Sequence, residues 1–309
     1  MAALITTLGE RSRADLGTIL PHEHVFVDLG PKAEHNWEDA DPDDVVDVMA
    51  PEIERAREEG VTALVECTPE GVGRRVDVDL AVSQATDFPI VVPTGIYQEP
   101  AIPAWAREAS EDDLYEWLLA ELTDGVEDTG VRAAWIKVST DDDDPTGLSD
   151  DEAKILRAAA RAGAETDALI GSHTLHGSVV HRQLDLIEDA GYTADRFVWI
   201  HAQAESDTSL HREIADRGAY VEYDWIGGED RNDAYYVDRV QTMLEDGFDD
   251  RVLLSQDRGW YDPSEPSGGE QKPYTYLTGE FLPKLRDAGI DDAAVRRLTE
   301  DNPFEAFAR

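Results

Sequence analysis

Histidines next to apolar segments are the first residues in this sequence that could do chemistry. His22 and His24 lie two residues apart, and because alternate side chains of a strand point to one face, both could bind the same cation. His173 and His201 end two later apolar segments, and Asp257 ends the last one. Taken singly, each histidine could be a hydrogen-bonded core residue, and Asp257 could cap a turn. Imidazole nitrogens with a carboxylate oxygen suit Zn, Mn, Fe, Co or Ni, so the set together predicts a divalent-metal site.

Lys137 interrupts an apolar segment, Ala133-Ala-Trp-Ile-Lys-Val138. An ammonium is disfavoured there because burial removes its hydration. Three interpretations are open: a paired core lysine, a Schiff-base nucleophile, or, after carbamylation by CO₂, a bridge between two metal ions. The four histidines favour the bridge.

Apolar segments that alternate with helical segments must position these residues. Near-continuous apolar character is typical of parallel strands that are buried on both faces. Strands are predicted at 19–27, 61–67, 90–96, 133–138, 168–174, 197–202, 219–224 and 252–257. Helices are predicted at 44–59, 111–122, 179–190, 206–217, 233–245, 274–288 and 291–298, with another that begins at the capping box Ser149-Asp-Asp-Glu152.

Eight strand–helix repeats in 309 residues predict an α/β fold, a (β/α)₈ TIM barrel that forms a single domain over residues 1–309. The alternative is a doubly wound open sheet, which would carry a glycine-rich turn after the first strand. That position reads Pro21-His-Glu-His24 instead. In a barrel the carboxyl ends of all strands meet at one face, so the predicted ligands should converge there. The long loop at 258–273 is expected to overhang that face.

The charge balance limits the class of partner. The chain carries 68 Asp and Glu against 27 Lys and Arg, a net charge of −41 that is spread along its length. Such a surface argues against binding to nucleic acid or to anionic membranes. Its self-repulsion is screened in molar salt, where the Debye length falls to roughly 3 Å. Only five of the basic residues are lysine, and the composition indicates a halophilic protein, with an acidic mesophilic protein as the alternative.

No feature of the sequence suggests export. Cys67 is the only cysteine, which excludes an internal disulfide and indicates a buried packing residue. The N-terminal residues do not resemble a signal peptide, and no segment approaches 18 apolar residues. A cytoplasmic protein with a small-molecule substrate is expected, and its assembly is left open, a homodimer included. The residues expected to lie on the surface or in packing are His35, His176, His181, His211 and the acidic loop 141–144.

Short motifs in a fixed order connect the chain to a known family. They are Gly17-Thr-Ile-Leu-Pro-His-Glu-His24, Gly71-Val-Gly-Arg74, Thr94-Gly-Ile-Tyr97, Trp135-Ile-Lys137, His173-Thr174, Ile200-His201 and Ser255-Gln-Asp257-Arg-Gly, and the match extends through Asn302-Pro303. In this order they make the sequence similar to the phosphotriesterase family, in the lactonase branch of the amidohydrolase superfamily. The resemblance implies a hydrolase with two divalent metal ions, zinc being the first expectation.

The resemblance also implies a role for each ligand. The more buried metal ion would be held by His22, His24 and Asp257, the more exposed one by His173 and His201, and both would be bridged by carbamylated Lys137 and a hydroxide. The hydroxide would attack a lactone or ester carbonyl, and Asp257 would accept its proton and return it to the leaving oxygen. Tyr97 matches a tyrosine that faces the metal pair in lactone-cleaving members. We expect it to contact substrate, with a packed aromatic at the barrel rim as the alternative.

The sequence departs from the family pattern at two places. Many members have an acid three residues after the sixth-strand histidine, where this chain has Ala204. Many also have His or Arg after the seventh-strand aspartate, where this chain has Asp224-Trp225. The proton of the catalytic aspartate is therefore expected to leave by another route, through Gln203 or Glu205.

The favoured function is hydrolysis of a lactone or another ester. Sugar-derived lactones are preferred because Trp225 and Trp260 could stack on a sugar ring. Phosphotriester hydrolysis stays open as a main or side reaction, since it too places a hydroxide against a polarised centre. A Schiff-base lyase that uses Lys137 is the alternative from another class, and a catalytically inactive barrel that serves as a binding module is the third. The measured metal content would distinguish the metal-dependent hydrolase from the lyase and from the binding module.

Overall fold

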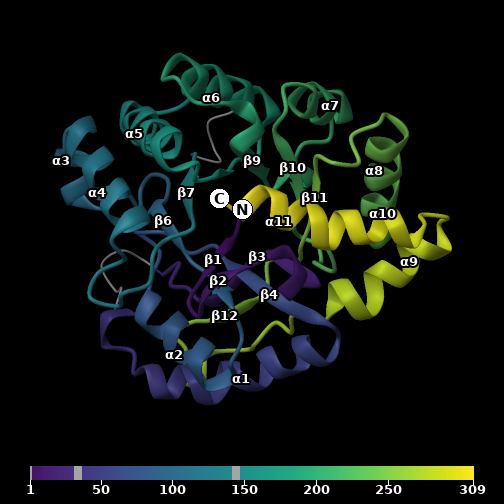
Figure 1. The fold of residues 1–309 in the computed structure, drawn as a ribbon, viewed down its shortest axis with the longest axis horizontal. Helices are drawn as coiled ribbons and strands as arrows, with labels where there is room; N and C mark the ends of the chain where they lie inside the picture. The colour runs from purple at the N-terminus through teal and green to yellow at the C-terminus, as the bar shows by residue number, and fades with distance from the viewer. Residues whose placement is uncertain (1, 31–36, 141–146) are drawn as a thin grey trace.

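A ring of parallel strands surrounded by helices forms the molecule, as the alternating pattern predicts (Figure 1). The structure is a computed structural model that describes residues 2–30, 37–140 and 147–309, so the predictions for His35 and the loop 141–144 lie outside the described residues. Each of the eight predicted strand segments contains an observed strand. The strands of the ring are β3 Thr18–Phe26, β4 Val61–Glu66, β5 Ile90–Val91, β6 Pro93–Ile96, β7 Trp135–Ser139, β8 Ile170–His173, β9 Phe197–Ile200, β10 Tyr220–Tyr223 and β11 Val252–Leu254.

Two seams interrupt the hydrogen-bonded ladder round the ring. The paired strands run in the orders β5-β4-β3-β12 and β6-β7-β8-β9-β10-β11, where β12 covers Gly259–Tyr261. The third predicted strand breaks between β5 and β6, beside Pro93, which has no N–H to donate. Between β11 and β3, the hydroxyl of Ser255 accepts the backbone N–H of His22 at 3.1 Å. The second seam therefore lies next to a predicted metal ligand.

Helices cover the outside of the ring (Figure 1). The capping box at Ser149 and Glu152 is confirmed, with reciprocal hydrogen bonds of 2.8 and 3.2 Å. None of the described helices is long and apolar enough to cross a membrane. The α-helices are α1 Pro42–Glu58, α2 Val76–Thr86, α3 Ala104–Glu108, α4 Glu111–Thr123, α5 Asp150–Thr166, α6 Gly177–Asp189, α7 Thr208–Asp216, α8 Asp233–Glu245, α9 Leu282–Asp287, α10 Asp292–Arg296 and α11 Asn302–Phe307.

Several elements were not predicted. Helix α2 begins Val-Asp-Val-Asp-Leu, an alternation typical of a strand, but it is a helix whose valines at 76, 78 and 82 are buried and whose Asp77 pairs with Arg75 just before it. A short hairpin of β1 (Leu4–Thr6) and β2 (Gly9–Arg11) precedes the ring. The predicted helix at 274–288 starts with a π-helical turn, Leu277–Phe281, before α9. Strand β12 lies inside the segment predicted as a long loop and pairs with β3.

Apolar side chains close the amino-terminal end of the barrel. Inward-facing residues of the strands form one cluster with the N-terminal hairpin and the C-terminal helix α11. The ring of Phe307 packs edge-on against Trp135 at 5.2 Å, and the backbones of Ala3 and Arg309 exchange two hydrogen bonds of 3.1 Å. In Figure 1, both termini and α11 accordingly lie over the centre of the ring. The cavity that contains the predicted site residues lies at the opposite end, where the strands' carboxyl ends meet.

Candidate metal centre and active site

One cavity of about 740 Å³ lies at the carboxyl ends of the strands. The nine residues predicted as metal ligands or substrate contacts line this cavity. These residues are His22, His24, Tyr97, Lys137, His173, His201, Trp225, Asp257 and Trp260. The loop after β11 contributes Gln271, Lys272 and Pro273 to the same lining, so it borders the mouth as expected.

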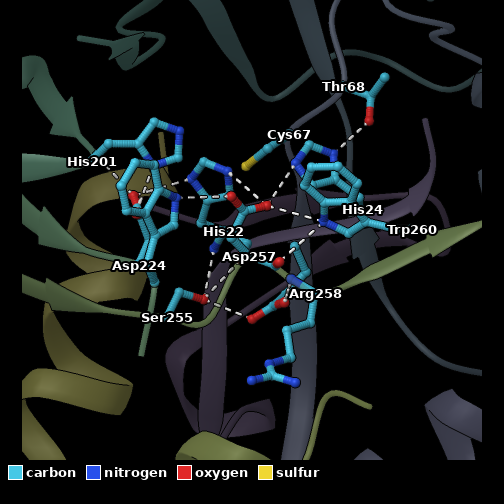
Figure 2. Close-up of polar contacts among 12 residues, drawn as sticks. His22, His24, Cys67, Thr68, His201, Asp224, Ser255, Asp257, Arg258 and Trp260 are labelled. Atoms are coloured by element: carbon cyan, nitrogen blue, oxygen red, sulfur yellow. Dashed lines mark hydrogen bonds and ion pairs between the residues drawn. The ribbon is translucent and has the colours of Figure 1, made fainter. Parts of the chain in front are cut away.

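His24 is fixed by a threonine that the sequence reasoning missed. Its Nδ1 atom lies 2.7 Å from the hydroxyl of Thr68, and that hydroxyl donates to the carbonyl of Phe26 at 2.9 Å (Figure 2). Because the hydroxyl proton is used in the second bond, the Nδ1 of His24 must carry a proton and donate. Nε2 faces Oδ1 of Asp257 at 3.2 Å. Burial lowers the pKa of His24, but the hydrogen bonds with Asp257 and Glu66 outweigh it and raise the pKa to about 9, so both ring nitrogens carry protons when no metal ion is bound. A metal ion at Nε2 would displace the proton there.

His22 and His201 are oriented by carboxylates of β10 and the residue after it. Nδ1 of His22 lies 3.3 Å from Glu222 Oε2 and 3.4 Å from Asp224 Oδ2. Nδ1 of His201 lies 2.7 Å from Asp224 Oδ1, and its backbone N–H donates to Oδ2 of the same residue at 2.9 Å. Asp224 thus holds two imidazoles with their Nδ1 protons toward it. Burial, followed by the charge of Lys137, lowers the pKa of His22 to about 3, so its ring is neutral and able to ligate.

Asp257 lies at the centre of the histidine cluster (Figure 2). Its backbone has φ +52°, a left-handed conformation that costs a non-glycine residue roughly 1–3 kcal/mol and that occurs most often at functional sites. His201 shares this feature, with φ +66°. Burial raises the pKa of the Asp257 carboxyl, but the hydrogen bond with His24 and the nearby His22 outweigh it, and the net pKa lies well below its usual range. The carboxyl is therefore an anion, as a metal ligand must be.

Lys137 lies on β7 with a glycine on each neighbouring strand. Its register partners are Gly95 and Gly171. A Cβ atom on Gly95 would lie 1.9 Å from the Lys137 carbonyl oxygen, so only glycine allows the strands to approach there. The Lys137 side chain is buried and reaches the cavity. His173 completes the cluster, with its ring 4.4 Å from that of His201.

Three buried glutamates next to the predicted ligands were missed. Glu222 contacts His22, Glu23 accepts the Arg258 N–H at 2.7 Å, and Glu66 accepts the Thr68 N–H at 2.9 Å. Burial raises the pKa of Glu23 to about 8, and burial followed by the Asp224 charge raises the pKa of Glu222. Glu222 could have been found, because a residue two positions before Asp224 on a strand faces the same way.

The two residues expected to take protons from Asp257 lie elsewhere. Gln203 is buried, and its amide group donates to Asp224 Oδ1 at 2.7 Å and accepts the Asp224 N–H at 3.1 Å. Glu205 accepts the N–H of Asp207 at 3.0 Å, in the loop before α7. Gln203 therefore holds the carboxylate that orients the histidines, and no described contact joins either residue to Asp257.

Both predicted tryptophans contact the central aspartate directly. The indole N–H of Trp225 donates to Oδ2 of Asp257 at 3.1 Å, and that of Trp260 lies 3.2 Å from Oδ1 and 3.0 Å from the backbone carbonyl. The ring of Trp225 also packs at 4.9 Å from that of His201. Tyr97 packs edge-on against His173 at 5.4 Å. All three aromatic residues are therefore positioned by the predicted ligands.

The donor set fits divalent metal ions. Ligand atoms of His22, His201 and Asp257 lie within 4.8 Å of one another. The Nδ1 atom of each of His22, His24 and His201 faces a side-chain oxygen, the outer-shell pattern that directs Nε2 toward a metal ion. Neutral imidazoles with an anionic carboxylate are the ligands that zinc and similar ions prefer.

The fold and this site define a (β/α)₈ barrel hydrolase with a histidine-rich cavity suited to metal ions. The chain belongs to the phosphotriesterase family, whose model matches residues 2–307. It is 29% identical to a phosphotriesterase homology protein of Mycobacterium tuberculosis (all of this chain, 98% of that protein) and 24% identical to an aryldialkylphosphatase of Saccharolobus solfataricus (95% and 96%). A solved structure, described as organophosphate hydrolysis engineered from a weak promiscuous lactonase template, superposes with a TM-score of 0.86 at 27% identity over 99% of both chains.

Proposed function

We propose that this chain is a binuclear metal-dependent hydrolase of lactones or other carboxylic esters. The observation that carries the proposal is the way three imidazoles are held. In His22, His24 and His201, Nδ1 contacts a buried side-chain oxygen, so Nε2 is the ring atom that can bind a metal ion beside the ionised Asp257. The proposed ligands are His22, His24, Lys137 as its carbamate, His173, His201 and Asp257. When bound, two divalent cations would lower the pKa of a water molecule and polarise the ester carbonyl.

Residues of this chain would supply the proton transfers and the substrate contacts. Asp257 is the general base that accepts a proton from the attacking water and then protonates the leaving oxygen. Trp225 and Trp260 hold that carboxylate through their indole N–H groups and shield it from bulk water. Tyr97 packs on His173 and lines the cavity, which supports its proposed contact with the substrate.

A sugar-type lactone is the substrate class that the cavity supports best. Its lining combines aromatic rings with charged and amide side chains, including Trp225, Asp230 and Gln271, which suits a polar ring with hydroxyl groups. The similarity to a structure derived from a promiscuous lactonase supports a lactone substrate. Phosphotriester hydrolysis is the second candidate, favoured by the similarity to an aryldialkylphosphatase.

Metal content and substrate choice test the proposal together. The purified protein should contain about two metal equivalents per chain, by elemental analysis, and should lose lactonase activity with a chelator and regain it with zinc, manganese or cobalt. A panel of aldonolactones, acyl lactones and aryl phosphotriesters in molar salt would rank the two substrate classes. Metal-independent turnover, with trapping of a carbonyl substrate on Lys137 by borohydride, would instead establish the Schiff-base lyase.

A further inference from the structure

Lys272 lies at the cavity mouth in a position that the hydrolytic chemistry leaves without a role. It is one of five lysines in the chain, and it lines the cavity from the loop that follows β11. Its ammonium lies 3.7 Å from the centroid of the Trp260 ring, a cation–π contact. Its backbone exchanges hydrogen bonds of 2.9 and 3.1 Å with Gly259 on β12, which fixes the base of the side chain.

The ammonium has no carboxylate partner among the described residues. This is unexpected in a chain with 68 acidic residues, and the lysines of the outer helices, Lys154 and Lys284, both form ion pairs. Acidic residues do line the cavity, at Glu229, Asp230 and Glu270, but no ion pair joins any of them to Lys272. The cation is thus available to a ligand that enters the cavity.

A second cation lies close by. Arg258 lines the same cavity. Burial lowers the pKa of Lys272, the charge of Asp257 opposes that effect, and the charge of Arg258 adds to it. The guanidinium of Arg258 donates to the carbonyl of Gly227, lies 5.5 Å from the ring centroid of Tyr276, and points away from the histidines (Figure 2). Arg258 is therefore anchored, while it makes the mouth more attractive to an anion.

Trp260 connects this cation to the reacting end of the cavity. Its ring packs edge-on against His24 at 5.5 Å, and its N–H lies 3.2 Å from Asp257. Lys272 is therefore one aromatic ring away from the proposed metal ligands. Lys272 and the proposed ligands line one cavity of about 740 Å³, so a ligand that fills this cavity can contact both.

We propose that Lys272 binds an anionic substituent, a carboxylate or a phosphate, carried by the substrate at the end remote from the hydrolysed bond. This inference rests on the proposed lactone or ester hydrolysis and names its substrate class: acidic sugar lactones rather than neutral ones. Lys272 would be a specificity-determining residue, since it contacts the substrate but none of the reacting atoms.

Matched substrate pairs test the inference and separate the two anions. D-glucono-1,5-lactone would be compared with its 6-phosphate, and D-glucono-1,4-lactone with D-glucaro-1,4-lactone, which carries a carboxylate. The wild type should prefer the anionic member of at least one pair by about tenfold or more in kcat/KM, the scale of one charge-assisted hydrogen bond. The preferred pair identifies the anion. Equal rates within both pairs would overturn the inference.

Substitutions at Lys272 test whether this residue causes the preference for the anionic substrate. Lys272→Met should raise KM for the anionic member about tenfold, with kcat and the neutral member little changed, and Lys272→Arg should keep the preference. Lys154→Met is the matched control, because it removes one positive charge on α5, outside the cavity. An equal loss for charged and neutral lactones in Lys272→Met would show that the lysine only supports Trp260, and would refute the anion site.

A binding measurement keeps this result separate from the proposed hydrolysis. The ring-opened acids gluconate, 6-phosphogluconate and glucarate cannot be hydrolysed, and their affinities are measured by calorimetry at fixed salt. The compound with the preferred second anion should bind the wild type about tenfold more tightly than gluconate, and Lys272→Met should remove the difference. If no lactone or ester is hydrolysed but this difference holds, the proposed hydrolysis fails and the anion site stands. If the wild type binds these acids with equal affinity, the anion site is refuted and the proposed hydrolysis is unaffected.

Discussion

At the residue scale, two indoles and a histidine surround the Asp257 carboxylate. Trp225 and Trp260 each donate an N–H toward its side chain, and His24 contacts the same carboxylate. An indole donates a hydrogen bond but has no lone pair on nitrogen with which to carry a proton onward. Both tryptophans therefore orient and shield the carboxylate.

Replacement of Trp225 separates this orienting contact from stacking on substrate. Trp225→Phe keeps a ring beside His201 but removes the hydrogen bond to Asp257, so we expect metal affinity or kcat to fall about 10–100-fold, as for other outer-shell contacts. Metal affinity is measured by competition with a chelator. Trp105→Phe, at an exposed position on α3, is the control. If Trp225→Phe behaves as wild type while Trp225→Ala loses only activity on sugar lactones, the ring acts by stacking.

His211 makes stability depend on pH away from the metal site. It is fully buried on α7 against Tyr223, and burial, followed by the charge of Arg239, lowers its pKa from 6.5 to about 4. Between pH 6.5 and pH 4 the unfolded chain binds a proton that the folded chain does not, so stability falls as the pH falls through this window.

The comparison of wild type with His211→Gln isolates this effect from the many carboxylates. Between pH 7 and pH 4 the wild type should lose about 3 kcal/mol of unfolding free energy relative to the variant, from the size of the pKa shift. Urea unfolding at each pH measures the difference. A constant difference across the window would contradict the prediction.

At the scale of elements, strand pairing places Lys137 between two glycines. A side chain at Gly95 would meet the Lys137 carbonyl at 1.9 Å, and its φ of +122° disfavours any other residue. The close approach of β6 to β7 therefore positions the proposed bridging lysine. At the seam between β11 and β3, the Ser255 hydroxyl accepts the His22 N–H and so helps to position that histidine.

Gly95→Ala should destabilise the protein and displace Lys137 at the same time. We expect a loss of more than about 3 kcal/mol, from steric overlap added to backbone strain, together with loss of bound metal. Gly191→Ala is the matched control, because Gly191 also has a positive φ, +88°, but nothing lies within 4 Å of its Cβ position. Chemical unfolding and elemental analysis give the two readouts. Similar losses in both variants would refute a special role for the approach at Gly95.

At the scale of the whole molecule, a net charge of −41 sets the conditions for stability. Repulsion among exposed carboxylates weakens as salt shortens the Debye length, so molar salt should favour the folded chain. The prediction of halophilic character rests on the same repulsion.

We expect the thermal midpoint to rise by more than about 10 °C between 0.2 M and 2 M KCl, because screening relieves repulsion in the folded state. Circular dichroism gives the midpoint, and sucrose at equal osmolality controls for solvent exclusion, which acts without screening. A midpoint that does not respond to KCl, or that responds equally to sucrose, would count against the halophilic interpretation.

Much of the fold and the site could be predicted from the sequence because both follow local patterns. Buried parallel strands need continuous apolar segments, so all eight were visible, and residues at their carboxyl ends must converge in a barrel. The nine predicted site residues share one cavity for that reason. Helix α2 was not predicted, because its first residues alternate in polarity and show no helical period.

Only the tertiary structure decided what surrounds those residues. Glu222, Thr68 and Glu66 reach the histidines from strands or loops distant in sequence, and the indoles of Trp225 and Trp260 face the aspartate rather than the solvent. Lys272 lies over Trp260 because β12 pairs with β3 and turns the loop back over the mouth. Periodicity follows from the geometry of a single strand or helix, whereas these contacts depend on how separate elements pack, which no local pattern records.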